Sequence, residues 1–198
     1  MAEPVPTNRP ASAAPRAGGG RRTLLLIAAV TLAPVVASYT IYYLFPRESG
    51  ANYGTLLPTA PAPAIQGRAQ DGTAFRLEDL RGRWVLLAVG AGDCDAACER
   101  KLYATRQART MQGREQERVV RAWLVVGDVA PPPGLLAQHP GLVVVRVADA
   151  VPAMLPGGAS GLYLVDPLGN MVLRYGEDPD IKGIAKDLSR LLKASRIG

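Results

Sequence analysis

Residues 23–45, TLLLIAAVTLAPVVASYTIYYLF, form a continuous run of 23 residues without a charged side chain. At 1.5 Å per residue, a helix of this length crosses a hydrocarbon layer of about 30 Å, so the run predicts a transmembrane helix. Pro34 lies in its middle, and membrane helices accept proline more readily than soluble helices do. Three tyrosines gather at the far end, where amphipathic rings favour the membrane interface: Tyr39, Tyr42 and Tyr43.

The segment before this run, residues 1–22, is poor in large apolar side chains and predicts a disordered tail. Its basic residues are Arg9, Arg16, Arg21 and Arg22. Positive charge beside a membrane span favours the cytoplasmic side, so we expect the tail to be cytoplasmic. The sequence therefore predicts a single-pass protein of the inner (plasma) membrane, with its C-terminal domain on the periplasmic or extracytoplasmic side.

A second interpretation of the same run is a cleavable signal peptide. Val35 and Ala37 would then be the small residues before a cut at Ser38. The apolar run continues past that point and exceeds the roughly 7–15 residues of a signal-peptide core, which favours the transmembrane helix. Both interpretations export the rest of the chain.

The formal net charge of +6 does not by itself indicate a nucleic-acid partner. Part of the excess lies in the predicted cytoplasmic tail, and basic residues farther along, such as Lys101 and Arg121, are interspersed with acidic ones. We expect these side chains to lie on the solvated face of a helix. Export also argues against contact with nucleic acid.

Residues 46–63 are rich in Pro and Ala and predict a linker, which leaves residues 64–198 for one domain. A hairpin with its turn at Asp71 and Gly72 opens this domain. Continuous apolar runs predict buried strands at residues 84–90, 119–127 and 142–147. A second hairpin covers residues 161–176, and apolar spacing predicts helices after the first buried strand, from Cys98 to Met111, and within residues 178–195. A strand that leads into a helix and back to a strand implies a parallel crossover, so the expected fold class is an α/β sandwich.

The chain has two cysteines, Cys94 and Cys98, and both follow the first buried strand, where the helix begins. Binding sites of open parallel sheets lie at the carboxyl ends of strands. A helix N-terminus favours a thiolate, and residues four apart on a helix share one face, although the neighbouring Asp93 and Asp95 oppose the negative charge. The pair is therefore a candidate redox couple, a candidate pair of Cu(I) ligands, or a structural disulfide.

The segment GTAFRLEDLRGRWVLLAVGAGDCDAAC resembles the opening of thioredoxin-like domains, and the Cys-x-x-x-Cys spacing with the later GLYLVDPLGN resembles the Sco/SenC family. The resemblance covers about residues 64–198. It implies a thioredoxin-like sandwich with a central mixed sheet on a membrane anchor. It also implies a role in assembling the copper centre of cytochrome c oxidase, by copper handling or thiol-disulfide exchange. The partners so implied are cytochrome c oxidase subunit II or another thiol or copper protein.

The sequence departs from the family pattern in two places. The family's histidine ligand would fall eight residues before Asp166, where this chain has Gly158, and no proline stands between the cysteines. His139, in the loop segment LAQHPGL, is the one histidine and a weak candidate third ligand. Met154 is another soft donor, for which we expect buried packing. A non-catalytic, membrane-tethered scaffold or interaction protein with a structural disulfide is therefore the alternative function.

Overall fold

The structure, a computed structural model, describes residues 20–44, 52–156 and 158–195. It divides into two compact units, residues 1–48 and 49–198, which we describe separately. The described part of the first unit is one helix, α1 (Gly20–Leu44), with Pro34 inside it. Its stretch Gly20–Ile41 has a mean hydropathy of 2.2, and it is the one helix in the described residues long and apolar enough to cross a membrane. Phe45, the last residue of the predicted span, lies outside the described residues.

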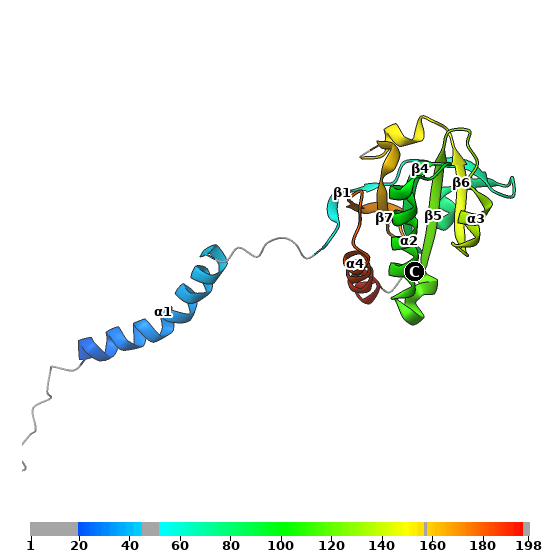
Figure 1. The fold of residues 1–198 in the computed structure, drawn as a ribbon. Helices are drawn as coiled ribbons and strands as arrows, with labels where there is room; N and C mark the ends of the chain where they lie inside the picture. Colours follow the sequence, from blue (N-terminus) through cyan, green and yellow to red (C-terminus); the bar gives the residue numbers. More distant parts are fainter. Residues whose placement is uncertain (1–19, 45–51, 157, 196–198) are drawn as a thin grey trace, which may run out of the picture. The chain divides into compact units, whose positions relative to one another are not determined.

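The second unit alternates strands and helices (Figure 1). Its strands are β1 (Thr55–Pro61), β2 (Gln66–Ala69), β3 (Ala74–Arg76), β4 (Trp84–Ala91), β5 (Val119–Val126), β6 (Leu142–Val147), β7 (Leu162–Val165) and β8 (Asn170–Tyr175). Its α-helices are α2 (Ala96–Thr110), α3 (Pro133–Ala137) and α4 (Ile181–Ala194). Short 3-10 helices are η1 (Leu77–Leu80), η2 (Gly113–Arg118), η3 (Val151–Met154) and η4 (Gly158–Ser160).

All eight of these strands form one mixed sheet in the order β1-β8-β7-β4-β5-β6-β2-β3. The central pairs β4–β5 and β5–β6 are parallel, and every other pair is antiparallel. This topology confirms the predicted α/β sandwich with a central mixed sheet. The crossover from β4 through α2 to β5 places the cysteine segment at the carboxyl end of the central strand.

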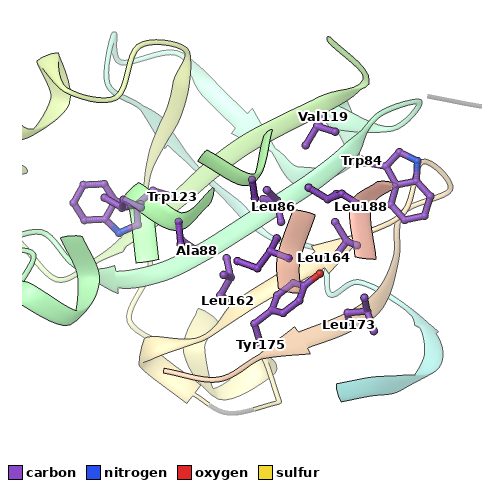
Figure 2. Close-up of a cluster of buried hydrophobic side chains, with 14 of the residues drawn as sticks. Trp84, Leu86, Ala88, Val119, Trp123, Leu162, Leu164, Leu173, Tyr175 and Leu188 are labelled. Carbon is purple, nitrogen blue, oxygen red and sulfur yellow. The ribbon is translucent and has the colours of Figure 1, made fainter. Parts of the chain in front are cut away.

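The centre of the sheet is buried on both faces, because successive residues of β4 belong to two different apolar clusters. Trp84, Leu86 and Ala88 face the cluster that contains side chains of α2, α3 and α4. Val85, Leu87 and Val89 face the cluster formed with η1, η3 and the first hairpin. Figure 2 shows the first cluster, with Trp84 and Trp123 at opposite ends. This two-sided burial explains why β4 and β5 are continuous apolar runs in the sequence.

Strand β1 lies within the stretch predicted as a linker, and it pairs with β8 at the edge of the sheet. Strand β1 begins at Thr55, so within the described residues the fold reaches further toward the N-terminus than the expected boundary at residue 64. Edge strands tolerate proline because one side of the strand needs no partner. No alternating apolar pattern accompanies this strand, which is why the sequence does not reveal it.

The segment that leads into β1 is fixed to α4 by Asp187, whose side chain is fully buried. Its carboxylate accepts hydrogen bonds from the backbone N–H groups of Tyr53 and Gly54, both at 2.9 Å. The Tyr53 ring lies directly over Gly183, where an added Cβ would come within 2.3 Å of it. A buried carboxylate that receives two backbone N–H groups holds the start of the domain in place.

Candidate functional site

The two cysteines form a disulfide with their Cα atoms 5.1 Å apart. Asp95, which lies between them, is the N-cap of α2, and its side chain accepts a hydrogen bond from the Cys98 N–H at 2.9 Å. Cys98 is therefore in the first turn of the helix, whereas Cys94 precedes the cap. This corrects the expectation that both cysteines lie on one face of the helix. The sulfurs meet because the backbone turns sharply at Cys94, where φ is +42°.

The two cysteines are not equally accessible. Cys94 is 5% exposed and belongs to the core cluster beneath α2. Cys98 is partly exposed and packs against the edge of the same cluster. The backbone N–H of Cys94 also donates to the Ala91 carbonyl at 3.2 Å, which holds the residue against the end of β4. A reagent from solvent therefore meets Cys98 first.

A cleft of about 620 Å³ opens beside the disulfide. Both cysteines line it, together with the ends of β4 and β5, Lys101, Ser160 and Glu177. Two residues before Cys94 lies Gly92, where an added Cβ would lie 1.8 Å from the Val129 carbonyl oxygen. The segment after β5 thus packs against the cysteine loop at a distance that only glycine permits.

Lys101 brings a buried positive charge into this cleft. Its side chain is 4% exposed, and its Nζ donates to the Ser160 carbonyl at 2.7 Å. Burial lowers the pKa of Lys101 from its ordinary 10.5, while the carboxylates of Glu177 and Asp95 oppose that shift. In the described part of the chain, Lys101 forms no salt bridge. Its positive charge therefore lies at the disulfide cleft, where the Glu177 and Asp95 carboxylates offset part of it.

The burial of Lys101 and Arg121 corrects the expectation of a solvated helical face. Arg121, on β5, is 3% exposed, and its Nη2 donates to the Pro140 carbonyl. Lys101 directly precedes Leu102 of the apolar stripe and follows Cys98 by three positions, which is one turn of helix. That spacing from a candidate cysteine is the signal in the sequence that marks Lys101 as a site residue.

Trp123 lies under the cysteine segment on β5. A Cβ added to Gly90 would lie 3.5 Å from the Trp123 Nε1 and 3.7 Å from the Cys98 Sγ. The indole N–H is buried and has no hydrogen-bond partner among the described residues. Because the indole and the sulfur flank the same glycine, Trp123 fluorescence is a natural reporter of the disulfide.

The position at which the family resemblance expects a histidine, Gly158, begins η4. Ser160, two residues later, lines the cleft and receives the Lys101 hydrogen bond, so this segment borders the disulfide. No histidine or methionine is among the residues that line the cleft. Within the described residues, no group of three or more His, Cys, Asp or Glu side chains is placed to hold a metal. The soft metal donors among the residues that line this cleft are the two sulfurs.

His139 lies elsewhere, in the segment after α3. It is 5% exposed and lines a separate cavity of about 460 Å³, whose lining includes neither cysteine. Burial, together with the positive charges of Arg106 and Arg121, lowers the pKa of His139 below its ordinary 6.5. The structure therefore does not bring this candidate ligand together with Cys94 and Cys98.

Met154, the other soft donor, is at the end of η3 and is 49% exposed. The expectation that it packs in the core is wrong. The core contacts of this segment are made by Val151 and Leu155 instead. Like His139, Met154 is not among the residues that line the cleft.

A family model described as "Transmembrane-like, thioredoxin-like, C-terminal domain" matches residues 84–195, which is more than half of the chain. The chain belongs to this family. The matched region of this thioredoxin-like domain runs from the start of β4 to the end of α4, so it contains the disulfide and Lys101. No curated protein sequence matches the chain.

Solved structures with the same fold include Sco proteins. Copper-bound ScoI of Bradyrhizobium japonicum is 21% identical, with a TM-score of 0.53 over 66% of this chain and 99% of that one. Apo Sco1 of Thermus thermophilus is 23% identical, with a TM-score of 0.56 over 72% and 96%. A putative protein disulfide isomerase of Bacteroides thetaiotaomicron is 17% identical, with a TM-score of 0.52 over 72% and 94%. The predicted resemblance to Sco proteins is thus confirmed for the fold.

Proposed function

We propose that this protein is a membrane-anchored, Sco-like assembly factor that acts by thiol-disulfide exchange at Cys94 and Cys98. The observation that carries the proposal is a disulfide at the carboxyl end of the central strand, which borders a cleft with a buried lysine and whose second cysteine is partly exposed. Exchange requires an accessible sulfur and favours a cationic neighbour, because the attacking species and the leaving group are thiolates.

Copper handling is the second candidate function, and the two adjacent sulfurs favour it. When the disulfide is reduced, the same backbone presents two thiols at one end of the cleft. Soft thiolates suit Cu(I). The Bradyrhizobium relative is described as copper-bound, which supports copper as a cargo here. With two sulfur donors in the cleft, the bound ion would remain open to transfer.

In this proposal the apolar helix α1 anchors the protein in the inner membrane, with the N-terminus in the cytoplasm and the domain outside. The recipient would be a thiol or copper protein of the same compartment, for which cytochrome c oxidase subunit II is the first candidate. An oxidising compartment suits a protein whose cysteines are paired. A membrane-impermeant maleimide added to intact cells after mild reduction would label the cysteines if the domain is outside.

The experiment that separates these functions uses the reduced full-length chain in detergent. Exchange is measured by the rate at which glutathione disulfide re-forms the Cys94–Cys98 bond. Copper binding is measured by titration with Cu(I) against a chromophoric chelator. We expect rapid exchange, and we expect one Cu(I) per chain if copper is a cargo, with both activities lost in Cys94→Ser.

His139→Gln and Met154→Leu are the matched controls, because both residues are soft or nitrogen donors that lie outside the cleft. We expect both variants to retain exchange and copper affinity. If the protein exchanged thiols but bound no copper, its function would be thiol-disulfide exchange alone. If the native protein neither exchanged nor bound copper, the scaffold with a structural disulfide would remain and the proposal would be wrong.

A further inference from the structure

We propose that the two cysteines have fixed and unequal roles: a partner thiolate attacks Cys98, the second cysteine, and Cys94, the first, is the leaving and resolving sulfur. This assignment rests on the exchange function proposed above and specifies its order. It follows from the burial, backbone and charge around each sulfur.

Access favours Cys98. A thiolate displaces a sulfur in line with the bond that breaks, so the attacked atom needs free space on the side away from its partner. Cys94 borders the cleft too, but it is 5% exposed and packs within the core cluster, so little of this residue is open to an attacking thiolate. Cys98 is partly exposed in the first turn of α2 and lines the cleft. An external thiolate can therefore reach Cys98 without disturbing the core.

Backbone geometry gives Cys94 the complementary role. Cys94 has a left-handed backbone conformation, φ +42°, which a residue with a side chain rarely adopts. Its N–H is bonded to Ala91, so the residue is tied to the end of β4 and not to the helix. When the bond to Cys98 breaks, the Cys94 sulfur stays beside the site, where it can attack again.

Charge favours the same order. Lys101 follows Cys98 by three residues, so the two share a helical face, and the Ser160 carbonyl holds its Nζ at the cleft. Its ammonium attracts an incoming thiolate toward Cys98. Asp93 directly precedes Cys94 and is exposed, so its carboxylate repels an anion that approaches that sulfur. Asp95 favours neither sulfur, because it follows Cys94 in the chain and its carboxylate also accepts the Cys98 N–H.

In this exchange a partner dithiol is the reductant of the Cys94–Cys98 disulfide. One partner thiolate attacks the Cys98 sulfur, a new partner–Cys98 bond forms, and the Cys94–Cys98 bond breaks to release the Cys94 thiolate. The second partner thiolate then attacks the partner's own sulfur and releases the Cys98 thiolate. The partner becomes a disulfide, this protein becomes a dithiol, and the two protons of the partner are transferred to the two new thiolates. If the second thiolate is absent, Cys94 attacks Cys98 and restores the starting state.

The test locates the first mixed disulfide in the oxidised, full-length wild-type protein. Glutathione is added in detergent, the reaction is quenched with acid within seconds, and free thiols are alkylated. Tandem mass spectrometry of the peptide spanning residues 84–100 then shows which cysteine carries glutathione. We expect glutathione on Cys98 and the alkyl group on Cys94. Glutathione mainly on Cys94, or evenly on both, would overturn the assignment. Glutathione on neither would overturn the exchange function itself and the assignment with it.

Single-cysteine variants give a second, independent measurement. Reduced Cys94→Ala retains Cys98, and reduced Cys98→Ala retains Cys94. With the aromatic disulfide 5,5′-dithiobis(2-nitrobenzoate), we expect Cys94→Ala to react at least about tenfold faster, because the cysteine that it retains is the more exposed of the two. Equal rates, or a faster reaction of Cys98→Ala, would contradict the assignment.

Lys101→Met tests the contribution of charge, with Arg100→Met as its control. Arg100 is exposed on the same helix and pairs with Asp178. We expect Lys101→Met to slow the attack of glutathione thiolate on Cys98 by about tenfold and to reduce the salt dependence of this rate. Arg100→Met should change neither quantity. An unchanged rate in Lys101→Met would remove the electrostatic part of the argument.

Discussion

Reduction of the Cys94–Cys98 disulfide should lower the stability of the domain only slightly. The bridge joins residues with a sequence separation of 4, so it closes a very short loop. The entropy that such a loop removes from the unfolded chain corresponds to about 2 kcal/mol at 25 °C. The left-handed backbone at Cys94, φ +42°, costs about 1 kcal/mol, which reduction can release. The expected net loss is therefore about 1 kcal/mol.

A loss of this size is readily measured in the full chain. Both tryptophans, Trp84 and Trp123, lie in the buried core of the domain, so their emission reports on the domain and not on α1. We expect the thermal midpoint of the reduced protein to fall by about 3 °C relative to the oxidised protein. The double variant C94A/C98A should match the reduced wild type within about 1 °C, because it lacks the same bridge.

This prediction distinguishes a redox couple from a structural staple. A bridge that adds little stability can open and close while the fold persists, as exchange requires. A midpoint that falls by more than about 10 °C, or a domain that unfolds on reduction, would show that the bridge holds the fold together and would refute the reasoning.

Three other substitutions test separate parts of the structure. Asp187→Ala should destabilise the domain by about 3 kcal/mol in urea unfolding, because it leaves two backbone N–H groups without their charged acceptor; a loss below about 0.5 kcal/mol would contradict this anchor. Gly92→Ala should lower the free energy of unfolding by about 2 kcal/mol and change thiol reactivity, because its Cβ would clash with the Val129 carbonyl. The control Gly134→Ala, with open space around its Cβ, should change neither quantity. The pKa of His139 is lowered in the folded state, so the unfolded state takes up a proton first as the pH falls below about 6.5. The free energy of unfolding therefore decreases as the pH falls below that value. His139→Gln should make urea midpoints between pH 7 and pH 5 less dependent on pH, and an unchanged slope would contradict the shift.

Apolar patterns in the sequence predict most of the sheet and helices. The continuous apolar runs correspond to β4, β5 and β6, and the spaced apolar residues correspond to α2 and α4, because each of these elements buries a large apolar surface. The turn at Asp71 and Gly72 also lies between β2 and β3. Strand β1 could not be predicted in this way, since its residues are mostly exposed and its pairing depends on backbone groups.

The candidate site could be located from the sequence, but its asymmetry could not. Spacing alone places Cys94 and Cys98 together at the end of a strand and treats them as equivalent. Their difference arises from the backbone turn before the Asp95 cap, which directs Cys94 into the core. A lysine in a charged stretch is usually a surface residue. In the structure Lys101 is buried, and its ammonium donates to the carbonyl of Ser160, 59 residues away in the chain. Local pattern carries no information on such a long-range contact.

The reduction potential of the Cys94–Cys98 pair tests the account most directly. The full-length protein would be equilibrated with glutathione and dithiothreitol buffers of increasing reducing strength, and the dithiol fraction read from Trp123 emission and confirmed by alkylation. We predict one two-electron transition at a potential less negative than about −300 mV, with the fold retained on both sides. A bond that stays closed in native protein beyond about −300 mV, and opens only when the domain unfolds, would contradict the account.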